Sequence, residues 1–123
     1  MKKILVIEDN LEIRENVAEL LSLEGYHVLT APDGKAGVEA AFREVPHLIL
    51  CDVSMPELDG YGVLKQLRAS NKLSTIPFIF FTAHAEKKEI QQGLSEGAIN
   101  YLIKPLTAEK LIRAISSSLE KVH

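Results

Sequence analysis

The fold of this 123-residue chain is decided by residues 48–60, which read Leu48-Ile-Leu-Cys-Asp52-Val-Ser-Met-Pro-Glu-Leu-Asp59-Gly60. Four consecutive apolar residues that end at a carboxylate are typical of a central strand in a parallel sheet, because both faces of such a strand are covered. After the turn at Met55-Pro56, apolar residues recur at helical spacing at Val63, Leu64 and Leu67. This stretch therefore predicts one β-α unit with an acid at the carboxyl end of its strand.

The same β-then-α pattern occurs five times along the chain. The expected strands are Lys3 to Glu8, Tyr26 to Ala31, Leu48 to Asp52, Pro77 to Thr82 and Asn100 to Ile103. The second strand carries His27 and Thr30 and is the most polar, so it is expected at an edge of the sheet. Because parallel strands need right-handed crossovers, the pattern predicts an open α/β sheet with helices on both faces.

Five helices are expected between and after these strands. The first has Ile13, Val17, Leu20 and Leu21 on one face and stops at Gly25; the second starts at Asp33 and stops before Pro46; the third follows Pro56; the fifth has Thr107 as its N-cap and buries Leu111, Ile115 and Leu119. The fourth, near Glu86 to Glu96, has only Ile90 and Leu94 as apolar anchors. It is therefore expected to be the most loosely held helix.

The composition of the chain argues against a secreted, a membrane-spanning and a nucleic-acid-binding protein. The chain has 17 acidic and 14 basic residues, a net charge of −3, 46% hydrophobic residues and a single cysteine. Its length predicts one domain over residues 1–123, and Cys51 alone forms no intramolecular disulfide, so the cytoplasm is the expected compartment. No apolar run is long enough for a membrane span, and a mildly acidic chain is a poor match for nucleic acid, so neither partner is expected.

Polar side chains stand where four of the predicted strands end. Glu8 and Asp9 follow the first strand, Asp52 the third, Thr82 the fourth and Lys104 the fifth. One such residue is usually only the start of a solvated loop. Four strand ends together favour a site, because ligands bind beyond the carboxyl ends of the strands in open α/β sheets.

The charges of this group indicate a divalent cation. Glu8, Asp9 and Asp52 together with Lys104 sum to −2. Mg²⁺ fits best, since it prefers hard oxygen ligands and keeps open positions, whereas the four histidines show no paired zinc-ligand spacing. A metal beside a carboxylate, an amine and a hydroxyl is the equipment of phosphoryl transfer. Asp52, alone on a central strand, is the expected nucleophile.

At these residues the chain resembles the receiver domain of bacterial two-component response regulators, in the single-domain form of the chemotaxis regulators. The resemblance covers essentially the whole chain and rests on Ile7-Glu8-Asp9-Asn10, Asp52-Val-Ser-Met-Pro-Glu-Leu-Asp59-Gly60, Thr82-Ala83 and Gly97-Ala98-Ile-Asn-Tyr101-Leu-Ile-Lys104-Pro105. It implies a flavodoxin-like, doubly wound parallel sheet of five strands in the order 2-1-3-4-5, with five helices.

The resemblance also implies the chemistry of the site. Asp52 would accept a phosphoryl group from a sensor histidine kinase or a histidine phosphotransfer protein. Asp9 and Asp52 would ligate Mg²⁺ together with the backbone carbonyl of Ser54, and Glu8 would act through bound water. Thr82 and Lys104 would contact phosphoryl oxygens, and the Lys104-Pro105 peptide is implied to be cis.

A switch is implied as well. Thr82 and Tyr101 resemble the family's switch pair, in which the hydroxyl moves toward the phosphoryl group and the ring turns inward. The surface of helix four, strand five and helix five would then change and be recognised by an unknown downstream protein target. Ser54 and His84, two residues after Asp52 and Thr82, would tune the lifetime of the phosphoryl group.

Other functions are weighed against this one. A small phosphatase with an aspartyl nucleophile needs a second acid at the position that Ser54 occupies. A flavin- or nucleotide-binding module is disfavoured because Glu8-Asp9 would repel the phosphate of its ligand unless a metal intervenes. A receiver domain cut from a larger regulator, with an output domain after it, and a pseudo-receiver that is not phosphorylated are the alternatives. The chain is expected to be a phosphoacceptor rather than an enzyme, and Cys51 to be a buried core thiol.

Overall fold

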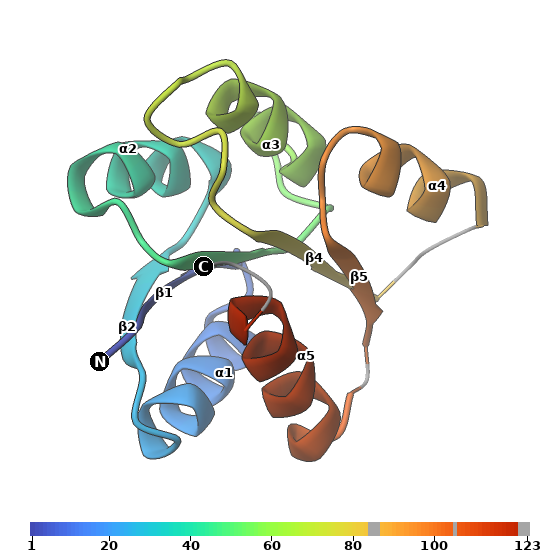
Figure 1. The fold of residues 1–123 in the computed structure, drawn as a ribbon. Coiled ribbons are helices and arrows are strands. Elements are labelled where there is room, and N and C mark those ends of the chain that lie inside the picture. The colour runs from blue at the N-terminus through green and yellow to red at the C-terminus, as the bar shows by residue number, and fades with distance from the viewer. Residues whose placement is uncertain (84–86, 105, 121–123) are drawn as a thin grey trace.

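The computed structural model describes residues 1–83, 87–104 and 106–120 and contains a five-stranded parallel sheet in the order β2-β1-β3-β4-β5 (Figure 1). The strands are β1 (Lys3–Ile7), β2 (His27–Ala31), β3 (Leu48–Cys51), β4 (Phe78–Thr82) and β5 (Asn100–Ile103), and the helices are α1 (Leu11–Leu23), α2 (Gly34–Glu44), α3 (Gly60–Arg68), α4 (Lys87–Ser95) and α5 (Ala108–Glu120). The predicted fold class and strand order are confirmed, and β2 lies at an edge.

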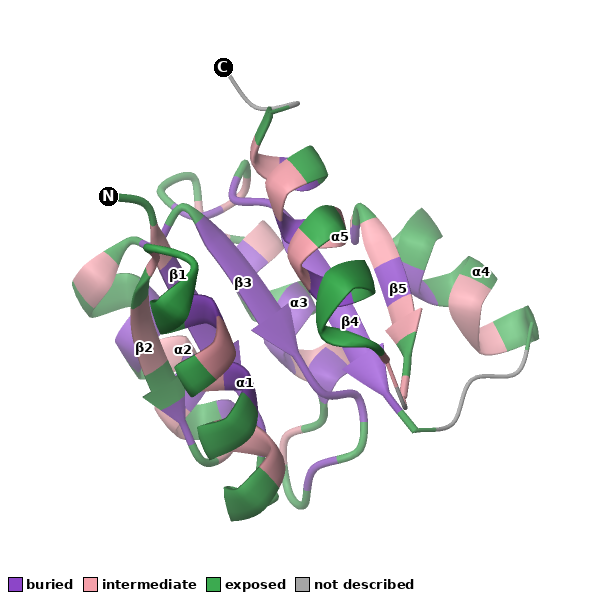
Figure 2. Ribbon diagram, turned by 90° about the horizontal axis from the view of Figure 1, so that it is seen from below, coloured by how far each residue is buried: buried purple, intermediate pink, exposed green. Residues whose placement is uncertain are grey.

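The sheet separates two layers of helices. Helices α1 and α5 cover one face, and α2, α3 and α4 cover the other (Figure 1). Each layer closes its own apolar core: Leu5, Ile49 and Phe80 belong to the core on the α2–α4 side, whereas Ile4, Leu50 and Ile79 belong to the core on the α1/α5 side. Alternate residues of one strand thus enter opposite cores, which explains why β3 and β4 are buried along their whole length (Figure 2) and β1 along all but its first residue.

Polar residues start four of the helices. The side chains of Asn10, Asp33 and Asp59 accept the backbone N–H groups of Ile13, Ala36 and Gly62, and Thr107 Oγ1 accepts the N–H of Lys110. Each bond satisfies an N–H group that the first turn of a helix leaves without a partner. The predicted N-cap Thr107 is confirmed, and α2 begins one residue after its predicted start because Asp33 is the cap.

Four predicted strand boundaries and two predicted helix anchors are wrong in detail. The strands β1 and β3 end one residue before Glu8 and Asp52, and β2 and β4 begin one residue after Tyr26 and Pro77. Leu119 is only partly buried, since Ser118 takes the buried position in the last turn of α5. Leu94 is 44% exposed, because α4 turns Gly93 rather than Leu94 toward the sheet.

The predicted looseness of α4 has a visible basis. Gly93 is the one fully buried residue among residues 87–95, and Ile90 is partly buried against the core. An added Cβ at Gly93 would lie 2.9 Å from the ring of Phe80 and 3.1 Å from that of Tyr101. The helix therefore packs closely while burying little apolar side chain.

In the part of the chain that the structure describes, no helix is long and apolar enough to cross a membrane.

Candidate functional site

The backbone brings the ends of the strands together. The N–H of Glu8 donates to Ala31 O at 3.1 Å, that of Asp52 to Ile7 O at 3.0 Å, and that of Lys104 to Thr82 O at 2.7 Å. Parallel pairing thus continues one residue past the strands, and it aligns residues that are far apart in the sequence at one edge of the sheet. The carboxyl ends of β1, β3, β4 and β5 form the rim of the site.

Three carboxylates meet on this rim. One oxygen from each of Glu8, Asp9 and Asp52 lies within 4.8 Å of the others. Glu8 is 2% exposed and Asp52 7% exposed, whereas Asp9 faces solvent. The predicted convergence of these acids is confirmed. The two buried acids are shielded from water by the fold, and the exposed acid leaves the cluster open on one side.

Lys104 is the cation of the cluster. Its Nζ lies 2.5 Å from Glu8 Oε1 and 3.5 Å from Asp52 Oδ2, and its side chain is 13% exposed. The same Nζ lies 4.7 Å from the centre of the Phe81 ring. A cation above an aromatic ring is attracted by the negative face of the ring. Lys104 is thus held between two carboxylates and one ring.

The electrostatics leave room for a divalent cation. The three acids and Lys104 sum to −2, and hard carboxylate oxygens are the ligands that Mg²⁺ prefers. Partial burial, and then the neighbouring Glu8 carboxylate, raise the pKa of Asp9. A carboxyl whose ionised form is disfavoured by its neighbours gains from a cation beside it. The donor set therefore fits Mg²⁺.

The loop after Asp52 is shaped by sharp backbone turns. Glu57 has a φ of 68°, and the N–H of Leu58 donates to Pro56 O at 2.8 Å. Gly60 allows the start of α3 to approach β3, because an added Cβ would lie 2.4 Å from the carbonyl oxygen of Asp52. The loop thus returns directly to the acid that precedes it.

The side chain of Asp52 is oriented by its neighbours. Its Oδ1 accepts the backbone N–H of Ser54 at 3.4 Å, and its Oδ2 faces Lys104. The side chain of Ser54 is exposed beside it. That the Ser54 carbonyl ligates a metal remains a prediction.

Glu8 is fixed from the side of α1. Its Oε2 accepts the N–H of Asn10 at 3.2 Å, and its backbone carbonyl accepts Arg14 Nη1 at 2.8 Å. With Lys104 on Oε1, both carboxylate oxygens of Glu8 have partners. This geometry holds Glu8 within the fold, while Asp9 remains exposed to an incoming ion.

The two members of the predicted switch lie on neighbouring strands. Thr82 is 1% exposed at the end of β4, and Tyr101 is 8% exposed on β5 beside Phe80. The Tyr101 ring lies 5.2 Å from that of Phe80, centre to centre. Tyr101 is therefore a buried residue in this structure rather than one that faces solvent. The predictions for His84 and for the Lys104-Pro105 peptide fall on His84 and Pro105, which lie outside the described residues.

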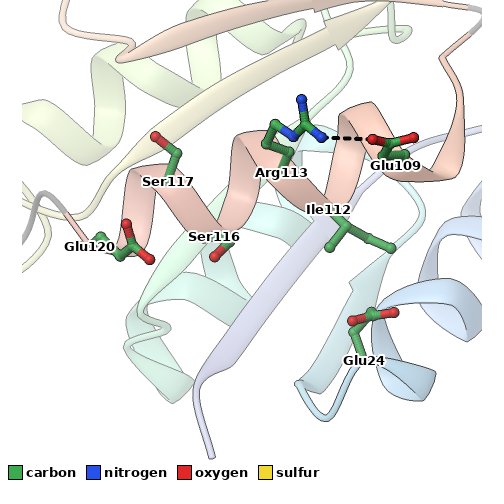
Figure 3. A pocket seen from close by; sticks show the side chains of 7 residues that line it. All are labelled: Glu24, Glu109, Ile112, Arg113, Ser116, Ser117 and Glu120. Atoms are coloured by element: carbon green, nitrogen blue, oxygen red, sulfur yellow. Dashed lines mark hydrogen bonds and ion pairs between the residues drawn. The ribbon is translucent and has the colours of Figure 1, made fainter.

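A separate groove lies among the described residues, away from the acidic cluster. It has a volume of about 590 Å³ and runs between α5 and the end of α1, lined by Glu24, Ile112, Ser116 and four other residues of α5 (Figure 3). An ion pair of 2.6 Å between Arg113 and Glu109 lies at its edge (Figure 3). None of its lining residues belongs to the acidic cluster.

Sequence reasoning missed three contributors to the site. They are Phe81, whose ring lies beside Lys104, Arg14, which donates to the Glu8 carbonyl, and Tyr61, whose hydroxyl contacts that of Tyr101. The types of Phe81 and Tyr61 carry no signal, because an aromatic residue on a strand or helix is ordinarily core, and an arginine on a helix is ordinarily solvated. Only the two-residue spacing of outward and inward positions on β4 and β5 could have placed Phe81 near Lys104.

Comparison with known proteins agrees with this geometry. The family model described as response regulator receiver domain matches residues 4–116. A probable transcriptional regulator, ycf27, of Cyanophora paradoxa is 42% identical over 99% of this chain and 50% of its own length. An uncharacterised 14.6 kDa protein of Leptolyngbya boryana is 37% identical over 91% of this chain and 86% of its own length.

Solved structures give the same answer. The chemotaxis protein CheY4 of Vibrio cholerae has a TM-score of 0.92 and 30% identity, covering 96% of this chain and 98% of its own. The receiver domain of the Francisella response regulator 1452 has a TM-score of 0.92 and 28% identity over the full length of both chains. The chain spans about half the length of the first curated relatives that it matches. This chain belongs to the family of response regulator receiver domains of two-component systems.

Proposed function

We propose that Asp52 accepts a phosphoryl group from the phosphohistidine of a sensor histidine kinase or of a histidine phosphotransfer protein. An Asp52 carboxylate oxygen bonds to phosphorus, the phosphorus–nitrogen bond breaks, and the imidazole leaves with its electron pair and takes up a proton. The observation that carries the proposal is the position of Lys104 Nζ, 3.5 Å from Asp52 Oδ2 at the end of a central strand. A cation at that point stabilises the charge that develops on the transferred group.

The metal in this proposal is Mg²⁺, held by Asp9 and Asp52 with the Ser54 carbonyl, and by Glu8 through water. Mg²⁺ neutralises the acids and the equatorial oxygens of a phosphoryl group. Asp9 supplies the exposed ligand, and Glu8 is kept in place by Lys104 and by the N–H of Asn10. The matching charge of −2 supports the assignment.

Phosphorylation is proposed to act on the surface of α4, β5 and α5. Thr82 and Lys104 contact the phosphoryl oxygens, and Tyr101 responds to the movement of Thr82. The small amount of apolar side chain that α4 buries supports this view, because elements that move are those that bury little apolar surface. Ser54 and His84 tune the lifetime of the modification, and a downstream protein reads the altered surface.

The alternatives are judged on the same residues. A pseudo-receiver needs no phosphoacceptor chemistry, and the assembled acids and Lys104 weigh against it. A phosphatase would need an acid at Ser54, so we propose that the chain acts on no separate substrate and promotes only its own phosphorylation and dephosphorylation. The alternative of a receiver domain within a longer regulator that carries an output domain is supported by the length of the first curated relatives, of which this chain spans about half.

Intact mass spectrometry tests the proposal. The protein is incubated with acetyl phosphate and Mg²⁺, and one phosphoryl group is expected on the wild type and none on Asp52→Asn or in EDTA. Asp59→Asn is the matched control, because asparagine also caps α3 and Asp59 lies in the same loop. A wild-type protein that stays unmodified, or an Asp52→Asn protein that is still modified, would refute the assignment.

A further inference from the structure

A short chain of hydrogen bonds joins α3, α4 and β5. Tyr61 Oη lies 2.9 Å from the Glu89 carbonyl oxygen and 3.1 Å from Tyr101 Oη. A carbonyl only accepts, so the single proton of Tyr61 goes to Glu89, and Tyr101 must donate its own proton to Tyr61. The direction of the chain is therefore fixed, from Tyr101 to Tyr61 to the backbone of α4.

The surroundings make these bonds consequential. The rings of Tyr61 and Tyr101 flank that of Phe80, with centres 4.9 Å and 5.2 Å away, so both hydroxyls emerge from an aromatic cluster. Burial raises the pKa of Tyr61 and of Tyr101 above the ordinary value of 10.0, so the protonated hydroxyls are favoured further. A hydroxyl in such surroundings is costly without a partner, and for Tyr101 that partner is Tyr61.

The bond to Glu89 also matters for α4. This helix approaches the sheet through Gly93, which offers no side chain to bury. The Tyr61 hydroxyl therefore contributes a specific tie between α4 and the body of the protein. Because the same hydroxyl accepts from Tyr101, the position of the Tyr101 ring and the position of α4 depend on one atom.

We propose that Tyr61 is a positioning residue that holds the Tyr101 ring inward and transmits its position to α4. The inference deepens the proposed function and rests on it for the link to Asp52. It predicts an order of effects. Tyr61→Phe removes both bonds of the chain, whereas Tyr101→Phe leaves the bond from Tyr61 to Glu89 intact. Each bond corresponds to a factor of about five in an equilibrium.

The first test uses the unmodified 123-residue protein labelled with ring-¹³C tyrosine. The chain has three tyrosines, so Tyr26→Phe, Tyr61→Phe and Tyr101→Phe assign the three ring signals. A soluble gadolinium chelate then reports ring exposure. We expect the inward-to-outward ratio of Tyr101 to fall about fivefold in Tyr61→Phe and to stay unchanged in Tyr26→Phe, whose site lies against the other core.

Amide hydrogen exchange at Gly93 follows α4 in the same samples. Exchange is expected to accelerate about fivefold in Tyr61→Phe and less in Tyr101→Phe, which keeps the tie to Glu89. If the gadolinium chelate relaxes the Tyr101 ring signal of Tyr61→Phe to the same extent as in the wild type, the proposal is overturned. This holds even where the variant is less stable. Equal acceleration in Tyr61→Phe and Tyr101→Phe overturns the order of the chain.

The second test adds beryllofluoride and Mg²⁺ as a mimic of the phosphorylated state. By linkage, the apparent affinity of Tyr61→Phe is expected to be weaker than that of the wild type or of Tyr26→Phe, by a factor of up to about five. A wild type that fails to bind beryllofluoride refutes the proposed function, while the tyrosine signals still decide the role of Tyr61. An unchanged affinity in Tyr61→Phe overturns the transmission from Tyr61 to the site.

Discussion

Neutralising Asp9 should stabilise the fold while it removes the Mg²⁺ response. One Asp9 oxygen lies within 4.8 Å of oxygens of Glu8 and Asp52, and Asp9 is exposed, so solvent screening applies. Each repulsion is then about 0.9 kcal/mol at a dielectric constant of about 80. Two such terms, offset in part by Lys104, leave about 1 kcal/mol of destabilisation in the absence of a cation. Asp9→Asn removes it.

The assay is urea unfolding followed by circular dichroism, in EDTA and in Mg²⁺. Asp9→Asn is expected to gain about 1 kcal/mol in EDTA, or about 4 °C in Tm, and to lose the stabilisation that Mg²⁺ gives the wild type. Glu19→Gln on the exposed side of α1 is the matched control, because it removes a charge outside the cluster.

The stability difference between Asp9→Asn and the wild type should change with pH in a definite direction. Because the folded-state pKa of Asp9 is raised above its ordinary value of 3.8, the folded wild type binds the proton more tightly than the unfolded chain. The stability from this group is fully present below that ordinary value and is lost as pH rises through the raised pKa. The advantage of Asp9→Asn must therefore be absent in acid and grow as pH rises. An Asp9→Asn protein that is no more stable than the wild type at neutral pH contradicts the reasoning.

Three further substitutions probe the neighbours of the acids. Lys104→Met leaves the carboxylate of Glu8, which is 2% exposed, without its cation. In a urea titration in EDTA the free energy of unfolding should fall by about 3 kcal/mol, and added Mg²⁺ should restore part of it. Phe81→Leu removes the ring beneath Lys104 and should weaken beryllofluoride binding about threefold, whereas Phe78→Leu, an equal loss of core volume, should not; equal effects would exclude the cation–π contact. Gly60→Ala should lower the free energy of unfolding by at least about 2 kcal/mol, since its Cβ would lie 2.4 Å from a backbone oxygen.

Gly62→Ala is the control for that last substitution, because its Cβ would meet only the flexible end of Leu58 at 2.5 Å. Alanine is about 1 kcal/mol better than glycine inside a helix, so this variant should be unchanged or slightly more stable. Thermal unfolding of the two variants side by side separates backbone crowding from helix propensity. A Gly60→Ala protein as stable as Gly62→Ala would mean that α3 does not approach β3 as described.

The sequence predicts the features that depend on local patterns. The runs at residues 4–7, 48–51 and 78–81 are apolar because their side chains enter both cores, so the central strands can be predicted from the sequence alone. The polar residues just beyond them meet on one rim because parallel strands share a direction, which made the convergence of Glu8, Asp52 and Lys104 predictable.

Contacts between elements were not predictable in the same way. Leu94 has the spacing of an anchor, yet the close approach of Gly93 to Phe80 turns it outward. Tyr61 reads as an ordinary residue of a helix face, and its bond to Tyr101 depends on where α3 and β5 lie in space. Such pairs are set by tertiary packing, which one sequence does not reveal.

The glycine contact of α4 has a consequence for how this protein could diversify. Since the helix meets the sheet through Gly93 and turns Lys87, Lys88, Gln91 and Leu94 to solvent, its outer face can be rewritten with little effect on folding. Exchange of those side chains for others would redirect recognition at almost constant stability. In this chain the freedom to acquire new binding specificities is thus found in a helix that contributes little apolar side chain to the core.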